Sequence, residues 1–235
     1  MNEIEDFYNF ESAYYEKIYG FFSDDILFYK SMPCSPPYLE LFAGTGRIIS
    51  KFKDGVGVEI NLKMLSRTSN VFNKILGDAR FLPVKGGFNT VIIGLNSLLL
   101  VPDPEKAQII SEVRRVLNLG GYLLVDVLNG FSLKKGMYEI ANLKENGLRI
   151  RLRLRPKRVG DTYVLRYRYL ISDGEDSHGK DRVVEKSITI YPITLDSLKK
   201  MMEERQLRIE KVYGDYDLSP YGRKSEKILV QAIAV

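Results

Sequence analysis

The chain has 235 residues, 45% of them hydrophobic and 28% charged, which is enough for one domain with a sizeable core. Its 35 Lys and Arg against 30 Asp and Glu give a net charge of +5, less than a dedicated nucleic-acid binder would carry. The one cysteine, Cys34, excludes an internal disulfide and a cysteine-built zinc site. The polar N-terminus is unlike a signal peptide, and the longest apolar run, 91–101, is too short to span a membrane. We expect a cytoplasmic protein with no metal and no membrane contact.

The first 30 residues are rich in aromatic side chains. Between residues 7 and 30 these recur at roughly helical spacing, which predicts one or two amphipathic helices. The prolines of SMPCSPP (31–37) end this pattern, because proline cannot continue a helix and favours extended chain.

Strands and helices then alternate as far as residue 128. Apolar strand runs separated by helices are typical of a parallel sheet that is covered on both faces. The predicted strands are 38–42, 55–60, 74–78, 90–96 and 122–128, and the predicted helices are 46–53, 62–72 and 102–117.

A different pattern begins after residue 147. LRIRLRLR (148–155) alternates strictly, with Ile150, Leu152 and Leu154 on one face and four arginines on the other. This pattern predicts an antiparallel sheet with one face in water. Its three strands are 148–155, 163–172 and 182–191, with a polar loop at 173–180, and a helix at 194–206 and strands at 208–216 and 227–235 follow.

The first predicted strand runs into a turn that holds two glycines, in LELFAGTGRI (39–48). Glycine admits positive φ and lets a ligand approach the backbone, and a helix N-terminus beyond the turn attracts negative groups. The turn is not a dinucleotide fingerprint, because Ile49 stands where the third glycine is needed. It is not a P-loop either, since no Gly-Lys-Ser/Thr follows.

Acidic residues close the next two strands. The carboxylate of Glu59 can accept hydrogen bonds from both hydroxyls of a ribose, and Asp78, one strand later, is placed to bind an adenine amino group. Because the carboxyl ends of parallel strands are where open α/β sheets bind ligands, these residues predict a site for an adenosine-containing cofactor.

Five segments resemble, in order, the successive motifs of class I S-adenosylmethionine-dependent methyltransferases: LELFAGTGR, GVEINLKML, ILGDARFLPV, FNTVIIGLNSLLLV and VLNLGGYLLVDVLN. The resemblance spans residues 38–129 and implies a doubly wound, Rossmann-like α/β sheet with S-adenosyl-L-methionine as cofactor. Phe42 takes the place of the family's usual first glycine. The resemblance implies that Gly44 and Gly46 pass under the methionine, Glu40 orients their loop, Glu59 binds the ribose, Ile60 and Met64 flank the adenine, Asp78 and Ala79 read its edge, and Asn96 lies near the transferred methyl.

The flanks resemble a smaller group, the small-molecule methyltransferases of the quinone-biosynthesis and sugar N-methyltransferase kind. Residues 15–19 (YEKIY) are similar to their Y-D-x-x-Y stretch, and VYGDYD (212–217) with Ser225 is similar to their ending. In that group the N-terminal helices close over the cofactor, so Tyr15 is included among the cofactor-binding residues. In the same group a three-stranded insert after the fifth strand covers the acceptor or forms a dimer contact.

The resemblance and the patterns together predict four parts. Residues 1–36 form a helical lid, 37–130 the cofactor-binding core, 131–193 the antiparallel insert, and 194–235 a helix and strand pair that complete the core sheet. The lid is expected to order when cofactor and acceptor bind.

The leading functional hypothesis is methyl transfer by in-line displacement to a nitrogen or oxygen of a small-molecule acceptor. Residues 96–99 (NSLL) replace the Asn/Asp-Pro-Pro-Tyr/Phe of enzymes that methylate base amines. No catalytic base is identified, and Asp126, Asn129 and the N-terminal tyrosines are candidates by location only. Two alternatives stay open: an RNA methyltransferase that uses the arginine-rich insert, and a non-catalytic, cofactor-binding regulatory subunit. A homodimer through the insert is also open.

Overall fold

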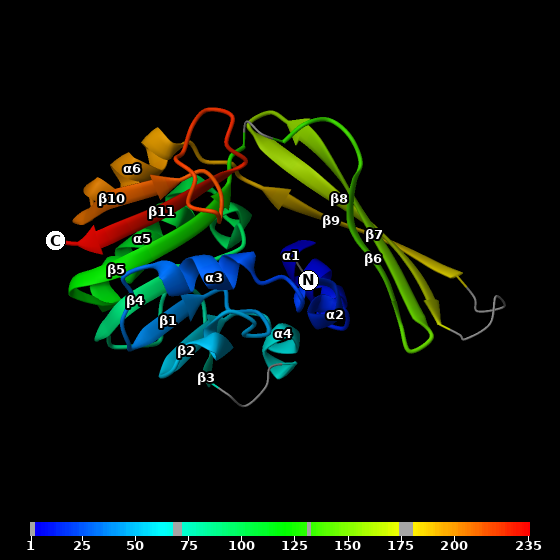
Figure 1. The fold of residues 1–235 in the computed structure, drawn as a ribbon, viewed down its shortest axis with the longest axis horizontal. Coiled ribbons are helices and arrows are strands. Elements are labelled where there is room, and N and C mark those ends of the chain that lie inside the picture. Colours follow the sequence, from blue (N-terminus) through cyan, green and yellow to red (C-terminus); the bar gives the residue numbers. More distant parts are fainter. Residues whose placement is uncertain (1–2, 68–71, 131–132, 174–180) are drawn as a thin grey trace.

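A seven-stranded sheet forms the core of the computed structural model, which describes residues 3–67, 72–130, 133–173 and 181–235 (Figure 1). The strand order is β10-β11-β5-β4-β1-β2-β3, with β11 and β10 antiparallel at one edge and the other neighbours parallel. The predicted doubly wound, Rossmann-like sheet is therefore confirmed. The strands are β1 (Tyr38–Leu41), β2 (Gly55–Glu59), β3 (Asn73–Leu76), β4 (Phe88–Ile93), β5 (Leu117–Leu128), β10 (Leu207–Tyr213) and β11 (Lys227–Ala234).

The central strands are apolar on both sides because helices cover both faces of the sheet. On one face Ile92, Leu124 and Leu229 pack against α3 (Asp24–Ser31). On the other face the alternate strand residues pack against α5 (Asp103–Val116) and α6 (Leu195–Glu203), as the cluster with Ile109, Ile110 and Leu198 shows. Alternation along each strand thus divides the core into two layers.

Two predicted helices are shorter than expected. In place of a helix over 46–53 there is a single 3-10 turn, η1 (Ile49–Lys51), because Gly46 before it has φ +80° and Phe52 after it is extended. The helix predicted over 62–72 is α4 (Leu62–Ser66), and residues 68–71 lie outside the described residues.

The insert has four strands, so the prediction of three is wrong. They are β6 (Tyr138–Glu145), β7 (Leu148–Val159), β8 (Thr162–Asp173) and β9 (Asp181–Ile190), and they pair in that order. The missed strand, β6, alternates only weakly, but Asn146-Gly147 joins it to β7 with φ values of 48° and 79°. Asn-Gly with two positive φ angles is the preferred two-residue hairpin turn, so the signal for β6 lay in its turn. Residues 174–180, in the predicted polar loop, lie outside the described residues.

The alternation in β7 divides the insert as the sequence predicts. Ile150 and Leu152 are buried, while Arg149, Arg151 and Arg155 are exposed. The register sets Arg153 opposite Arg168 and Arg155 opposite Arg166, so the basic face continues onto β8. Glu139 partly neutralises it, with Oε2 2.8 Å from Arg151 Nε and 3.9 Å from Arg153 Nε. We call these arginines of β7 and β8 the arginine face.

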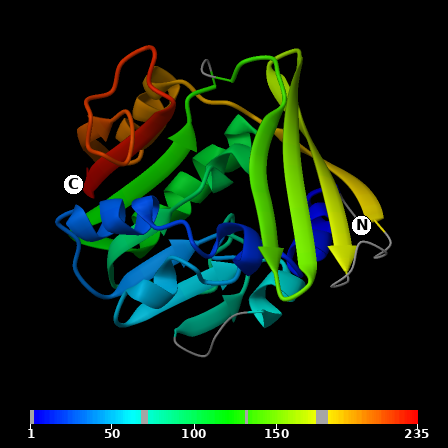
Figure 2. The same ribbon diagram turned by 45° about the vertical axis from the view of Figure 1, so that its right-hand side comes forward.

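The N-terminal helices divide between two places. Figures 1 and 2 show α1 (Glu3–Glu11) and α2 (Tyr15–Tyr19) between the core sheet and the insert. Asp6 joins α1 to β9 through Lys186 Nζ, 2.6 Å from its Oδ2. In contrast, α3 belongs to the core, where Phe28 and Tyr29 are buried. The opening of a lid stays a prediction, and it concerns α1 and α2. No helix of the described residues is long and apolar enough to cross a membrane.

The two faces of β7 should respond differently to truncation. Leu152→Ala removes a fully buried side chain and should lower the free energy of unfolding by about 2–5 kcal/mol. Arg151→Ala, the adjacent control, removes only an exposed ion pair and should cost at most about 1 kcal/mol. Urea unfolding measures both. Equal losses would contradict the assignment of the two faces.

Candidate functional site

A cavity of about 1230 Å³ lies where the carboxyl ends of β1 to β4 face α1, α2 and the insert. Its core side is lined by Gly44, Glu59, Asp78 and Asn96, each in a segment that follows a strand or ends one. Aromatic and aliphatic side chains line the opposite side: Phe7, Tyr8, Tyr15, Tyr19, Ile140, Leu154, Leu165, Tyr167 and Ile188. The core side, which we call the floor, therefore carries polar groups among apolar side chains, and the opposite side, which we call the roof, is largely aromatic and aliphatic.

The loop after β1 is held in a left-handed conformation. The φ angles are +57° at Phe42, +57° at Gly44 and +80° at Gly46. Phe42 thus adopts the backbone conformation that glycine takes more readily, at a cost of roughly 1–2 kcal/mol. Gly44 lines the cavity, whereas Gly46 does not: a Cβ there would lie 2.0 Å from the Phe72 ring. Gly46 is therefore required by packing.

Glu59 is buried at the end of β2 and joins two loops. Its Oε2 accepts a hydrogen bond from the Gly44 N–H at 2.9 Å, and its Oε1 accepts one from the Asn61 N–H at 2.7 Å. Burial raises the pKa of Glu59, and the backbone N–H groups around the carboxylate oppose that rise. A carboxylate offers about four lone pairs, so it can still accept hydrogen bonds from a ligand in the cavity.

The far end of the floor carries Asp78 and three exposed aliphatic side chains. Arg80 binds Asp78 through Nε and Nη2, at 3.0 and 2.6 Å from Oδ2, and this hydrogen bonding lowers the pKa of Asp78. Ile60, Leu62 and Leu76 line the cavity although each is more than half exposed. Apolar surface beside a carboxylate suits a flat ring with polar edges.

Asn96 follows β4 in the left-handed conformation, with φ +65°. Its N–H donates to the Asp126 carbonyl at 3.0 Å, which fixes the backbone. Its side-chain Oδ1 is buried and accepts no hydrogen bond from the described residues. Asn96 lines the cavity, although Oδ1 itself is buried behind its surface.

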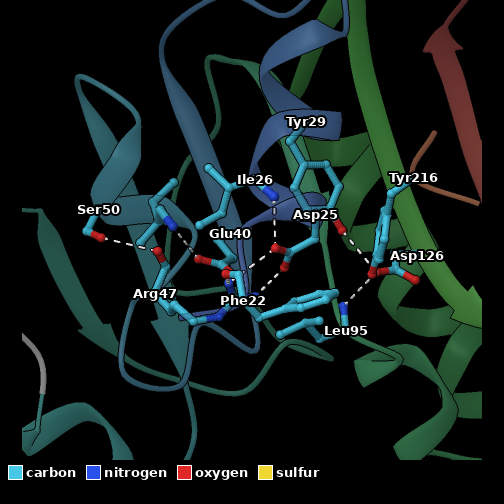
Figure 3. A network of polar contacts seen from close by, with 11 residues as sticks. Phe22, Asp25, Ile26, Tyr29, Glu40, Arg47, Ser50, Leu95, Asp126 and Tyr216 are labelled. Atoms are coloured by element: carbon cyan, nitrogen blue, oxygen red, sulfur yellow. Dashed lines mark hydrogen bonds and ion pairs between the residues drawn. The ribbon is translucent and has the colours of Figure 1, made fainter. Parts of the chain in front are cut away.

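Glu40, in β1, lies beneath the floor and orients the loop above it. Its Oε2 accepts a hydrogen bond from the Ile49 N–H at 2.9 Å, and burial raises its pKa to about 8. Arg47, in the same loop, forms a buried ion pair with Asp25 of α3, and its Nη1 donates to the Phe22 carbonyl at 2.7 Å (Figure 3). Glu40 does not line the cavity but a small pocket that it shares with Tyr15.

Asp126 is a structural residue rather than a base in the cavity. It is fully buried in β5, and its Oδ2 accepts hydrogen bonds from the hydroxyls of Tyr216 and Tyr29 and, at 3.3 Å, from the Leu95 N–H (Figure 3). Neither Asp126 nor Asn129 lines the cavity. Tyr216 belongs to the C-terminal segment VYGDYD, so this segment is hydrogen-bonded to the core sheet through Asp126.

The cavity also holds a carboxylate that the sequence analysis missed. Glu11, at the end of α1, is 2% exposed and accepts hydrogen bonds from Tyr169 and Tyr19. A charged residue within the aromatic stretch FYNFESAYY was the available signal, but the packing of α1 and α2 against the insert, which brings Tyr169 to Glu11, cannot be seen in the sequence. The described residues contain no group of three or more potential metal ligands.

The structure brings most of the predicted site residues to one cavity. Its lining includes every one of them except Glu40 and Gly46, whose positions are given above: Tyr15, Gly44, Glu59, Ile60, Met64, Asp78, Ala79 and Asn96. Their contacts with a cofactor stay a prediction.

Comparison with known proteins places the fold. Residues 39–125 match the methyltransferase domain family. No curated protein sequence matches the chain. An S-adenosylmethionine-dependent methyltransferase from Clostridium acetobutylicum has 16% identity and a TM-score of 0.75, over 97% of this chain and 99% of that one.

Two further solved structures cover nearly the whole chain. The sugar N-methyltransferase KedS8 from Streptoalloteichus has 17% identity and a TM-score of 0.72, over 100% of this chain and 94% of that one. The S-adenosylmethionine-bound amino pentose methyltransferase CalS10 from Micromonospora echinaspora, involved in calicheamicin biosynthesis, has 16% identity and a TM-score of 0.71, over 97% and 92%. Residues 39–125 therefore match a methyltransferase domain, and the whole chain has the fold of these solved methyltransferases.

Removal of the Glu59 carboxylate should weaken cofactor binding. Glu59→Ala should reduce the affinity for S-adenosylhomocysteine by about 1.5–3 kcal/mol, roughly ten- to a hundredfold, and Glu59→Gln by less, because the amide keeps one acceptor. Isothermal titration calorimetry, expected to show 1:1 binding, measures the effect. Glu105→Ala is the control, since Glu105 lines the same cavity but forms an ion pair with Arg80 at 2.8 Å. Unchanged affinity in Glu59→Ala would remove Glu59 from the site.

Proposed function

We propose that this methyltransferase transfers the methyl group of S-adenosylmethionine to a nitrogen or oxygen of a small-molecule acceptor by in-line displacement. The observation that carries the proposal is the cavity itself. At about 1230 Å³ it exceeds the roughly 300–1,000 Å³ typical of a site for one drug-sized ligand. It has room for a cofactor and a small acceptor side by side.

The polar floor suits the cofactor. In this proposal Glu59 holds the ribose, Ile60 and Met64 flank the adenine, and Asp78 and Ala79 meet its edge. The Gly44 loop, which Glu40 orients, and Asn96 hold the methionine end, with Tyr15 above it. These are the residues that the sequence motifs predict, and their convergence on one cavity supports the assignment.

The roof suits the acceptor. Leu154, Leu165, Tyr167 and Ile188 of the insert face the cavity from the side opposite the strand ends. An acceptor beneath them would approach the cofactor's methyl group from the side opposite the floor, as in-line displacement requires. Methyl transfer from a sulfonium needs correct positioning and the exclusion of water more than covalent assistance, and an enclosed apolar roof provides both. The likeness to KedS8 and CalS10 supports an acceptor of sugar-like size.

The arginine face is the one feature that favours RNA as an alternative acceptor. It lies on the side of β7 opposite Ile150 and Leu152, whose side chains pack toward α1 and α2. It therefore points away from the buried face of the insert, and Glu139 and Glu185 lie within ion-pair distance of its members. These contacts support a solvent-facing role. A homodimer through the insert stays a prediction.

A methyl-transfer assay distinguishes the two acceptor classes. With S-adenosylmethionine labelled in its methyl group, we expect label to enter small amines or hydroxyl compounds, such as amino sugars and phenols, and not total tRNA. At about 150 mM salt, where exposed charges are strongly screened, tRNA should not bind at sub-micromolar concentration. Labelled tRNA, or tight tRNA binding that Arg151→Ala/Arg153→Ala removes, would contradict the proposal and favour an RNA methyltransferase.

A further inference from the structure

A buried carboxylate with no cationic partner stands in the roof of the cavity. Glu11 Oε1 accepts hydrogen bonds from the Tyr169 hydroxyl at 2.8 Å and the Tyr19 hydroxyl at 3.3 Å. No hydrogen bond from the described residues reaches Oε2, and no lysine or arginine among them lies within ion-pair distance of Glu11. Since Glu11 lines the cavity, Oε2 is available to a molecule inside it.

Tyrosines surround this carboxylate. Five tyrosines of α1, α2 and β8 lie near enough to Glu11 for its charge to add to the rise that burial causes in their pKa: Tyr8, Tyr15, Tyr19, Tyr167 and Tyr169. Burial raises the pKa of both Tyr8 and Tyr15. On the core side the charge of Glu59 adds to the rise for Tyr8, while for Tyr15 Arg47 opposes the rise and Glu40 adds to it. Arg47 is already paired with Asp25. Burial raises the pKa of Glu11 to about 7, although the hydrogen bonds from Tyr169 and Tyr19 oppose the rise.

Stability does not account for a charge in this place. Removing a carboxylate from water is costly unless a positive charge accompanies it. A glutamine would accept the same hydrogen bonds from Tyr169 and Tyr19 without that cost. The negative charge is useful only toward something that enters the cavity, which aromatic side chains also line, and the faces of aromatic rings attract cations.

We infer that the acceptor carries a basic amine, that it enters the cavity as an ammonium ion, and that Glu11 is its counter-ion. The ammonium loses one proton, to Glu11 or to water, before its nitrogen lone pair takes the methyl group and the sulfonium leaves as a neutral thioether. This inference rests on the proposed small-molecule methyl transfer and narrows it to nitrogen-bearing acceptors. Glu11 is then a specificity-determining residue: a carboxylate without a cation rejects neutral alcohols, because binding one leaves the charge desolvated and unpaired.

The test uses two probes of nearly equal shape, cyclohexylammonium and cyclohexanol. Their binding is measured by ligand-observed NMR at pH 8, with and without saturating S-adenosylhomocysteine, on the wild type, Glu11→Gln and Glu3→Gln. Glu3 is the matched control, an exposed carboxylate that lines the same cavity from the same helix. S-adenosylmethionine and S-adenosylhomocysteine affinities are measured on all three by calorimetry.

We expect the wild type and Glu3→Gln to bind cyclohexylammonium at least about tenfold more tightly than cyclohexanol, and Glu11→Gln to lose that preference. Affinity of the wild type for the ammonium should fall as the pH drops through about 7, because protonation removes the charge of Glu11. If Glu11→Gln does not fold, this pH dependence of ammonium binding by the wild type tests the role of Glu11 instead.

Three results would overturn the inference. The first is equal binding of the two probes by the wild type, and the second is a preference for the ammonium that survives in Glu11→Gln. The third is a loss in Glu11→Gln of S-adenosylmethionine affinity alone, which would make Glu11 the counter-ion of the cofactor's sulfonium. Failure of the proposed function appears separately, as absence of S-adenosylhomocysteine binding by the wild type, and the titrations without cofactor still decide the role of Glu11.

Discussion

The Glu59 carboxylate fixes two segments of the site directly and a third, α1, through Asn61. Through Gly44 it holds the loop after β1, and through the Asn61 N–H it holds the start of α4. Asn61 in turn caps α4, its Oδ1 accepting from the Met64 N–H at 3.0 Å, while its Nδ2 donates to Asn9 Oδ1 of α1 at 3.1 Å. Glu59 and Asn61 therefore link the core sheet to α1 in the roof. A ligand that binds Glu59 would also lie next to the Gly44 loop and the start of α4.

The rest of the molecule forms the floor and the roof of the cavity, which Glu59 and Asn61 link. The core sheet provides a rigid floor, since its strand ends are anchored by buried apolar residues and by the Asp25–Arg47 ion pair, whose loss would leave a buried charge unpaired. The insert provides a roof whose inner face packs on α1 and α2 through Ile150, Leu152 and Tyr169. In the proposed function the floor binds the cofactor and the roof the acceptor, so acceptor preference could change in the roof without change in the floor.

Local patterns predicted the core because each signal lies within one strand and its turn: the apolar runs, the glycine turn, and acidic residues where strands end. The same reasoning predicted which face of β7 is buried. It failed where the deciding contact is distant in sequence. The packing of the N-terminal helices against the insert brings Glu11 to Tyr169, 158 positions away, and Gly46 is required by Phe72 rather than by a ligand. The strand β6 was missed for a different reason, because its signal is the Asn-Gly turn and not its own alternation.

A crystal structure with S-adenosylhomocysteine bound tests the central claim, that the floor holds the cofactor and the roof the acceptor. We predict that both ribose hydroxyls lie within hydrogen-bond distance of Glu59, and that the sulfur lies toward Asn96 with open space between it and Tyr167. A ligand bound under the insert away from Glu59, or one that fills the space beneath the roof, would contradict this division of the cavity.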